Sequence, residues 1–347
     1  MSDWEGTLDT YGRMIEERLA AFLENETREA IEYSDFIGRL YNDLREYIFR
    51  GGKRLASCST LLAYKGFTGH IDERILDICA GIELYRHSIL VHDDLIDEDE
   101  LRRGASTIHE KYSQMQDARF GAGLALFAGN ILYTLALKAL GSSGFELEKT
   151  AKALVTLNGA FQAVNESQVL DLLFEYEKPH VNEWYVMASK RAVSLFKASL
   201  LIGAELADAS KEDVQLLREA GEHVGFCFDI QDDVIDTFAS EEQYGRKPGG
   251  DLLKRKKPLH IVYTYSMANQ EQLRTFETAI QARPMVDLLS IRRVISECGA
   301  LQAAKSRSRE HADSAEKLIS ETNMSTEVKN FFISFIGYVK ESLDWYK

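Results

Sequence analysis

Apolar residues recur along most of the chain at the three- and four-residue spacing of a helix that buries one face. Two such runs consist of Ile75, Ile78, Cys79, Ile82 and Tyr85, and of Val214, Leu217, Val224 and Phe228. This period predicts amphipathic helices, and the two-residue alternation of a strand is hard to find. The first proline of the chain is Pro179. Because proline breaks helices, its absence from residues 1–178 favours long helices.

Short breaks rich in glycine and proline separate these runs, and none of them is long enough to be a linker between domains. The sequence has no repeat of fixed period and no low-complexity tract. The pattern therefore predicts an all-α protein with a single domain over residues 1–347, built from ten or more helices.

Residues 120–137 form an 18-residue segment without a formal charge, which approaches the length of a membrane span. The segment contains Gly121, Gly123, Gly129 and Asn130, and the chain has no other long apolar run. We therefore expect a buried core helix here and no transmembrane segment.

The composition, with 45% hydrophobic and 28% charged residues, is that of a soluble globular protein. A net charge of −14 excludes a general nucleic-acid-binding protein, which needs a basic face. The four cysteines are scattered and show neither zinc nor disulfide spacing. The acidic N-terminus lacks the basic region of a signal peptide, so a cytoplasmic location is predicted.

Charged residues are concentrated at the end of the first apolar run. Six acids fall within eight residues: Asp93, Asp94, Asp97, Glu98, Asp99 and Glu100. On a helix, Asp93 and Asp97 are one turn apart on one face. Carboxylates so placed can hold hard cations, and Mg²⁺ prefers carboxylate oxygens together with a substrate phosphate. The alternative is a solvated acidic helix end.

The same spacing occurs a second time, again at the end of an apolar run, in Asp232, Asp233 and Asp236. Two solvated helix ends would not need identical spacing. Two acidic clusters that face each other repel unless cations lie between them, so the repeat favours several Mg²⁺ ions and an anionic ligand. Diphosphate is the natural ligand.

Basic residues flank both acidic clusters. They are Lys53 and Arg54 after Gly51-Gly52, Arg102 and Arg103 before Gly104, Arg246 and Lys247, and the basic residues of 254–257. A helix N-terminus that carries Lys and Arg can hold phosphate through its dipole and its charges. Gly-Gly-Lys-Arg could also be only a helix start. Likewise, Arg102 and Arg103 could only pair with Glu98 or Asp99.

With these motifs, the chain from about Gly51 to Leu259 resembles the trans-isoprenyl diphosphate synthases of the polyprenyl synthetase family. The matching segments are GGKRL from Gly51, HDDLID from His92 with RRG from Arg102, SQVLDLLFE from Ser167, FDIQDDVID from Phe228, GRKPGGD from Gly245 and KKPL from Lys256. The resemblance implies the isoprenoid synthase fold, a helical bundle around a central cavity, and a homodimer.

The resemblance also implies roles for individual residues. Three Mg²⁺ ions would be bound by Asp93, Asp97 and Asp232, supported by Asp94, Asp233 and Asp236. The allylic diphosphate would be held by Arg102, Arg246 and Lys256, and isopentenyl diphosphate by Lys53, Arg54 and Arg103, with Gln168 also binding substrate. The implied reaction is ionisation of the allylic diphosphate, attack by isopentenyl diphosphate and loss of a proton.

Several positions depart from the family pattern. Arg86 stands where a histidine or glutamine is usual, Asp229 replaces the glutamine of a Phe-Gln pair, and Asn130 replaces the Asp of a Gly-Asp pair. The usual Lys-Thr pair appears as Arg191-Ala192 or, shifted by one, as Lys190-Arg191. We expect Lys190 or Arg191 to supply the missing catalytic charge. We also hypothesise that Arg86 and Asp229, both in contact with substrate, compensate each other.

Product length should depend on Ser88 and Ile89, one turn before Asp93. Neither residue is aromatic, so we expect a product of C20 or longer. Alternatively, Phe127 or Phe161 closes the cavity.

Two other functions stay open. A class I terpene cyclase shares the metal chemistry but generally needs one aspartate motif and no Gly-Gly-Lys-Arg site. A catalytically silent binding or regulatory subunit could keep the fold while the changes at Arg86, Ala192 and Asp229 abolish turnover.

Overall fold

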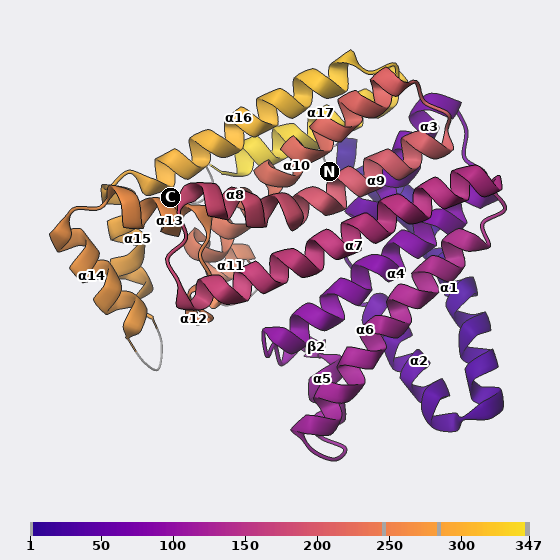
Figure 1. The fold of residues 1–347 in the computed structure, drawn as a ribbon, viewed down its shortest axis with the longest axis horizontal. Helices are drawn as coiled ribbons and strands as arrows, with labels where there is room; N and C mark the ends of the chain where they lie inside the picture. The colour runs from indigo at the N-terminus through magenta and orange to yellow at the C-terminus, as the bar shows by residue number, and fades with distance from the viewer. Residues whose placement is uncertain (1–2, 245–247, 283–285, 344–347) are drawn as a thin grey trace. The chain divides into compact units, whose positions relative to one another are not determined.

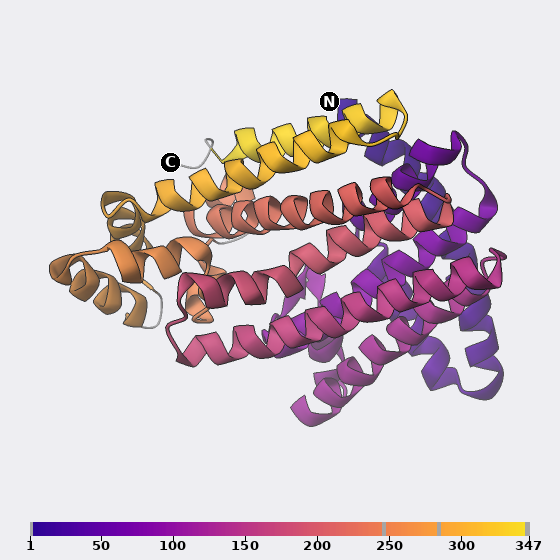
Figure 2. The same ribbon diagram turned by 45° about the horizontal axis from the view of Figure 1, so that its top comes forward.

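The structure is a computed structural model that describes residues 3–244, 248–282 and 286–343, and most of these residues are helical (Figure 1). The only strands among them are β1 (Leu101–Arg102) and β2 (Ala105–Ser106), which form a small antiparallel hairpin. The predictions of an all-α fold and of ten or more helices are confirmed. Figure 2 shows the same helices from a second direction.

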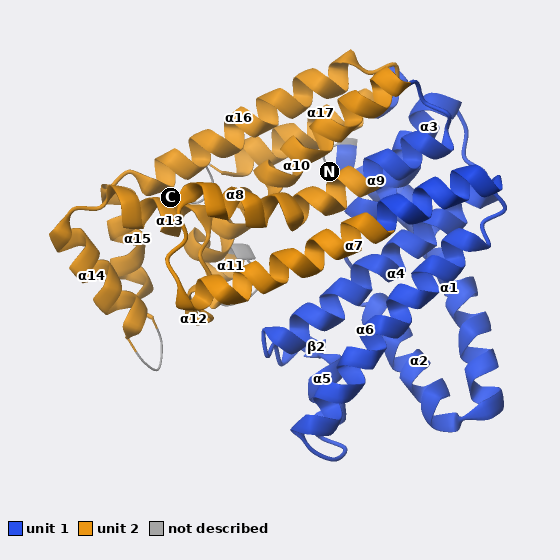
Figure 3. Cartoon of the chain, viewed as in Figure 1, with its two compact units in different colours: residues 1–157, 199–210, 324–328 blue, residues 158–198, 211–323, 329–347 orange. Residues whose placement is uncertain are grey.

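The described chain divides into two compact units (Figure 3). Unit 1 comprises residues 1–157, 199–210 and 324–328, and unit 2 comprises residues 158–198, 211–323 and 329–347. The helices α7 (Leu147–Tyr176), α9 (Ala192–Leu206) and α17 (Thr326–Ser342) each contribute residues to both units. The single-domain organisation of the chain stays a prediction.

Unit 1 is built around helix α4. Its other helices are α1 (Asp3–Tyr33), α2 (Asp35–Ile48), α3 (Leu55–Thr68), α5 (Ile108–Ser113) and α6 (Ala118–Gly141), and α4 itself spans Glu73–Ile96. The helices α1, α3 and α6 all pack against α4. The apolar run from Ile75 to Tyr85 is buried, as its period predicts. The packing thus fixes the helix that carries the first aspartate motif.

Helix α6 contains the uncharged segment 120–137. It is the one helix among the described residues that is long and apolar enough to cross a membrane, and 39% of its most apolar window is buried. One face packs against α4 and α5, and Gly129 leaves room there for the ring of His92. Leu126 and Phe127 are 47% and 61% exposed. The prediction of a buried core helix therefore holds for one face only.

Unit 2 has its core around helix α10. Its helices are α8 (Val181–Lys190), α10 (Lys211–Phe238), α11 (Glu241–Tyr244), α12 (Gly250–Leu253), α13 (Leu259–Met267), α14 (Gln270–Gln281), α15 (Leu288–Glu297), α16 (Ala300–Glu321) and α17 (Thr326–Ser342). Helices α10 and α16 lie side by side (Figures 1 and 2). Trp184, Ile230 and Val234 belong to one buried cluster, which anchors the helix that bears the second motif.

Candidate active site

The first aspartate motif occupies the last turn of α4, which ends at Ile96. The Asp94 side chain is only 1% exposed, and both of its oxygens accept hydrogen bonds. The Tyr47 hydroxyl donates to Oδ2 at 2.6 Å, and Nε of Arg102 donates to Oδ1 at 2.6 Å. Burial raises the pKa of Asp94, while the charge of Arg102 opposes that rise. Asp94 therefore holds Arg102 in position at the end of the helix.

Asp93 stands more open than its neighbour, with a side chain that is 31% exposed. Nη2 of Arg102 lies 3.4 Å from Oδ2 of Asp93 and 3.5 Å from Oδ2 of Asp99. The alternative that Arg102 pairs with the acidic run is thus correct for Asp99. Its closest carboxylate is nevertheless Asp94, because the β1–β2 hairpin directs Arg102 back to the end of α4.

The hairpin turn also brings the two basic motifs of unit 1 together. Arg103 and Gly104 form its two-residue turn with φ values of 53° and 79°, the positive values that such tight hairpin turns require. The Arg103 guanidinium donates to the carbonyl oxygen of Gly51. A Cβ atom at Gly52 would lie 2.5 Å from Nη2 of Arg103, so this approach needs glycine. Lys53 and Arg103 therefore belong to one basic surface.

The Gly-Gly-Lys-Arg segment does precede a helix, because α3 begins at Leu55 with Arg54 as its N-cap. Lys53 is exposed, and its ammonium lies 5.0 Å from the centre of the Trp4 ring. At that distance the ring attracts the cation. The chain thus places a lysine, an arginine and a helix N-terminus next to each other, as an anion site requires.

Arg54 differs from Lys53 because its side chain is only 3% exposed. Its guanidinium contacts Glu83 and Glu16, both at 2.9 Å, and the carbonyl oxygen of Ile48 at 2.8 Å. Although burial alone would raise the pKa of Glu83, Arg54 and His87 lower it below the ordinary value. Two carboxylates thus offset the charge of Arg54, which fixes the start of α3.

The Arg54 network also contains a buried histidine. His87 is 1% exposed, and one of its ring nitrogens lies 2.8 Å from the carbonyl oxygen of Glu83. Burial lowers the pKa of His87 to about 4, so the ring is neutral at pH 7. Arg86, the preceding residue, is half-buried, and its charge contributes, after burial and Arg54, to lowering the pKa of Arg103.

The second aspartate motif lies near the end of α10 in unit 2. Asp232 is exposed, whereas Asp233 and Asp236 are buried. Oδ2 of Asp236 accepts the backbone N–H of Asp251 at 3.2 Å. Oδ2 of Asp233 has no hydrogen-bond partner in the described part of the chain, and Nη2 of Arg191 lies 3.7 Å from it. Burial raises the pKa of Asp233, so a cation beside this oxygen would offset the cost of its negative charge.

Arg191 and Asp229 form a two-pronged ion pair within unit 2. Nε and Nη2 of Arg191 donate to the two oxygens of Asp229 at 3.0 and 2.7 Å. Arg191 lies at the break between α8 and α9, and its neighbour Lys190 pairs with Glu166 at 2.5 Å. Two departures from the family pattern therefore contact each other. The pairing of Asp229 with Arg86, a residue of unit 1, stays a prediction.

Lys256 contacts two acidic residues for which the sequence predicted no role. Its ammonium lies 2.7 Å from Asp171 and 3.1 Å from Glu175, and the lysine is 8% exposed. Asp171 and Glu175 are four residues apart on α7, hence on one helix face. That spacing within SQVLDLLFE was the signal that could have indicated them. Gln168 of the same motif is half-buried on α7.

Other predicted site residues are placed as follows. Arg246 lies outside the described residues, so its role stays a prediction. Ser88 is fully buried, and its hydroxyl has no hydrogen-bond partner among the residues that the structure describes. Ile89 is 8% exposed. Phe127, an alternative residue for closing the cavity, is exposed on α6, and Phe161 is half-buried on α7.

The donor chemistry fits a hard cation at each motif. Within the described ranges, no three His, Cys, Asp or Glu side chains converge as a complete metal site. Each motif nevertheless presents a carboxylate that solvent reaches at a helix end, Asp93 in one and Asp232 in the other, and Asp233 adds a buried oxygen that accepts no hydrogen bond from the described residues. Mg²⁺ is usually bound by one or two carboxylates plus substrate phosphates, so a partial ligand set is what it needs.

Comparisons with known proteins agree with this fold. The family model of polyprenyl synthetase matches residues 38–297. The chain is 32% identical over 250 residues to a short chain isoprenyl diphosphate synthase of Methanocaldococcus jannaschii, covering 72% of this chain and 73% of the relative. It is 29% identical to a geranylgeranyl diphosphate synthase of Methanosarcina mazei, over 88% and 83% of the two chains.

A solved structure shares the fold at lower identity. It is a geranylgeranyl pyrophosphate synthase from Corynebacterium glutamicum, complexed with isoprenyl diphosphate and magnesium. The TM-score is 0.90 at 22% identity, and the match covers 96% of this chain and 99% of that one. The fold is therefore that of the isoprenoid synthases, and the enzyme is a prenyltransferase. The chain belongs to the polyprenyl synthetase family.

Proposed function

We propose that this enzyme condenses an allylic diphosphate with isopentenyl diphosphate to a longer prenyl diphosphate in a Mg²⁺-dependent reaction. The observation that carries the proposal is the pair of aspartate motifs at the ends of α4 and α10, each with an arginine beside its acids. Acids alone would repel a diphosphate, and bases alone would not need two motifs of equal spacing. Metal ions and diphosphate together satisfy both groups.

Three Mg²⁺ ions would be held by Asp93, Asp97 and Asp232, with Asp233 as a further ligand. When bound, these ions would supply Lewis-acid stabilisation of the departing diphosphate. Asp236 would orient its helix end through the Asp251 amide. Asp94 would act on Arg102 rather than on a metal, because both of its oxygens already accept hydrogen bonds.

Basic residues would bind the two diphosphates. Arg102, Lys256 and Arg246 would hold the allylic one, and Lys53 and Arg103 the isopentenyl one, with Arg86 and Gln168 contributing. Arg54 would serve the second group by fixing the start of α3, since its own charge is offset by Glu16 and Glu83. Fixed donors that need no rearrangement stabilise developing charge most effectively.

The reaction follows from the electron demand of the substrates. The allylic C–O bond breaks and its electron pair leaves with the diphosphate, and the double bond of isopentenyl diphosphate attacks the carbocation. A proton then leaves the new cation, and the released diphosphate accepts it. Within unit 2, Arg191 and Lys190 would keep positive charge near this diphosphate, while Arg191 also neutralises Asp229.

The remaining features of the enzyme are proposals of the same kind. We expect a product of C20 or longer, because Ser88 and Ile89 are small or aliphatic and Phe127 points away from the interior of unit 1. A homodimer would cover the apolar face of α6 at Leu126 and Phe127. We place the enzyme in the cytoplasm.

The test is incubation of the purified protein with isopentenyl diphosphate and each of the C5 to C20 allylic diphosphates, with and without Mg²⁺, followed by product sizing. We expect a longer prenyl diphosphate only with both substrates and the metal. A hydrocarbon formed from one substrate alone would favour the terpene cyclase. Absence of a metal-dependent product from every pair would favour the silent subunit.

A further inference from the structure

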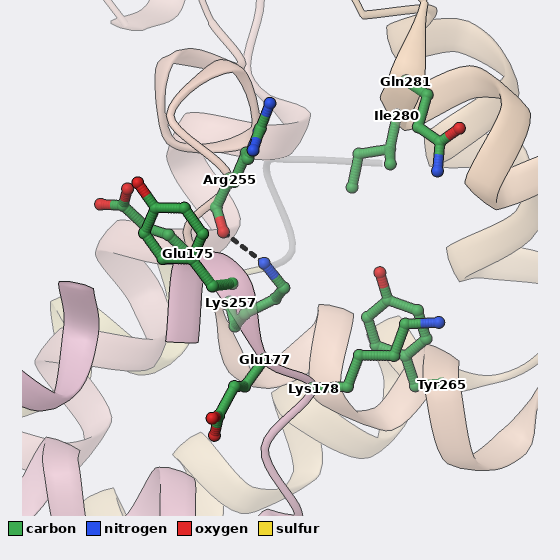
Figure 4. A pocket seen from close by; sticks show the side chains of 9 residues that line it. Glu175, Glu177, Lys178, Arg255, Lys257, Tyr265, Ile280 and Gln281 are labelled. Atoms are coloured by element: carbon green, nitrogen blue, oxygen red, sulfur yellow. Dashed lines mark hydrogen bonds between the residues drawn. The ribbon is translucent and has the colours of Figure 1, made fainter. Parts of the chain in front are cut away.

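A pocket of about 470 Å³ lies in unit 2 (Figure 4). Its walls come from the end of α7 and the residues after it, from the turn between α12 and α13, and from the ends of α13 and α14. None of Asp229, Asp232, Asp233 or Asp236 lines it. None of the residues that line the pocket therefore has a role in the reaction proposed for this enzyme.

The charged groups around the pocket are mainly basic. Lys178, Arg255 and Lys257 line it together with Glu175 and Glu177. Glu175 is already paired with Lys256 at 3.1 Å. Lys178 contacts Glu277 at 2.5 Å, but these two side chains are 58% and 42% exposed, so their pairing is weak and exchangeable. The side chains that line the pocket thus present more positive than negative charge to a ligand.

Lys257 is the least satisfied of these cations. It is 7% exposed, and the one hydrogen-bond partner of its ammonium among the described residues is the carbonyl oxygen of Arg255 (Figure 4). An ammonium has three donors, so two are left for a ligand. Burial lowers the pKa of Lys257 to about 8, with the charges of Arg255 and Lys178 adding to this and Glu175 and Asp171 opposing it. An anion beside Lys257 would offset the free-energy cost of burying its positive charge.

The rest of the wall suits the body of a small organic molecule. Tyr265 and Ile280 present an aromatic ring and an aliphatic side chain, and the Lys178 ammonium lies 4.6 Å from the centre of the Tyr265 ring. Gln281 adds an amide that can donate or accept. Pockets that bind small ligands combine such apolar walls with a few polar groups.

We propose that this pocket is a second anion site that binds the phosphate group of a small phosphorylated compound without a metal ion. Lys257 and Arg255 contact the phosphate oxygens, and Tyr265 and Ile280 pack against the remainder of the molecule. Because the site does not use the aspartate motifs, its occupancy does not require Mg²⁺.

Calorimetric titration of the full chain with inorganic diphosphate tests this proposal, at low ionic strength and pH 7 in the presence of EDTA. EDTA removes metal ions from the aspartate motifs, and the variants at Lys257 and Arg255 distinguish this pocket from the basic surface at Lys53 and Arg103, which also needs no metal. We expect saturable binding that weakens about tenfold in Lys257→Met and several-fold in Arg255→Gln, as loss of one charge-assisted hydrogen bond predicts. Lys211→Gln, which removes an exposed lysine at the start of α10, should leave the affinity unchanged within about twofold.

The titrations have results that would contradict the proposed anion site. Absence of binding in EDTA, or equal affinity in the wild type, Lys257→Met and Arg255→Gln, would overturn the proposal. If Lys257→Met does not fold, the exposed Arg255→Gln alone gives the answer. A second titration compares inorganic phosphate with adenosine monophosphate. Tighter binding of the nucleotide that is lost in Tyr265→Ala supports packing against the apolar wall. Equal binding of both compounds would show that the site contacts the phosphate group alone.

Discussion

The two aspartate motifs share one spacing, but their second aspartates have opposite surroundings. In the first motif, Asp94 is buried with both oxygens satisfied by Tyr47 and Arg102. In the second, Asp233 is buried with one oxygen that accepts no hydrogen bond within the described ranges. Identical sequence spacing therefore does not imply identical roles. One aspartate positions an arginine, and the other keeps an acceptor for a cation.

The difference arises from the partners that each unit supplies. In unit 1 the β1–β2 hairpin brings Arg102 to the motif, and it binds Asp94 directly. In unit 2 the corresponding cation, Arg191, is directed to Asp229 and reaches Asp233 only at 3.7 Å. A buried carboxylate that is not fully paired is costly, which is why such groups mark functional sites.

The largest effect on stability is expected from the Arg191–Asp229 pair. Asp229→Asn leaves a largely buried guanidinium with reduced compensation and should lower the free energy of unfolding by about 3 kcal/mol. A double-mutant cycle with Arg191→Met, followed by urea unfolding, measures the coupling. The matched control is Lys190–Glu166, whose side chains are 35% and 44% exposed and should couple by less than about 1 kcal/mol. Equal coupling in the two pairs would contradict the assignment.

Substitution of Asp94 and Asp233, the second aspartates of the two motifs, tests directly whether the motifs differ in role. Asp233→Asn removes a cation ligand and should lower kcat/KM about 100-fold, whereas Asp94→Asn should lower it only about tenfold by loosening Arg102. Steady-state kinetics at several Mg²⁺ concentrations checks this. Only Asp233→Asn should raise the Mg²⁺ concentration needed for half-maximal rate, and equal losses in both variants would remove the distinction.

A fall in pH should lower the free energy of unfolding through protonation of His87 in unit 1. Its folded pKa of about 4 lies below the unfolded value near 6.5, so the unfolded state takes up the proton first as pH falls. Between pH 6.5 and pH 5 this should cost about 1.5 kcal/mol of stability. The measurement is urea unfolding of the wild type and His87→Gln over that range. The variant should lack this part of the pH dependence, and parallel curves would show that His87 does not titrate as described.

The smallest effect is expected from the Tyr47 hydroxyl. Tyr47→Phe removes one donor from Asp94 while Arg102 remains, and should cost about 1 kcal/mol of stability. Thermal unfolding by circular dichroism, with Tyr112→Phe as the control for another hydroxyl that binds an aspartate, provides the comparison. A loss in Tyr47→Phe no larger than the scatter of replicate scans would mean that Arg102 alone fixes Asp94.

Much of this arrangement could be predicted from the sequence. The run from Ile75 to Tyr85 is buried on α4 because a helix with period 3.6 places these residues on one face. The position of both aspartate motifs at helix ends also follows from the apolar runs before them. The open face of α6 was not predicted, because an uncharged segment does not show which of its sides has a partner in the chain.

The contacts between distant residues could not be predicted in the same way. Arg191 and Asp229 are 38 positions apart, and only the break between α8 and α9 brings the guanidinium to that carboxylate. The sequence showed two unusual residues, and Arg86 was the partner expected for Asp229. Similarly, the burial of Arg54 depends on Glu16 of α1 and Glu83 of α4, and neither spacing indicates it.

The most direct test of metal binding by both motifs is the metal dependence of product formation in three proteins, the wild type, Asp93→Asn and Asp232→Asn, with isopentenyl diphosphate and an allylic diphosphate. We expect no product without Mg²⁺ and a loss of about 10³-fold in kcat/KM for each variant, because each motif supplies its own carboxylate for the metal. Glu98→Gln, which alters an exposed acid of the same run, should stay near the wild type. Full Mg²⁺-dependent turnover in either aspartate variant would contradict the claim that both motifs bind the metal.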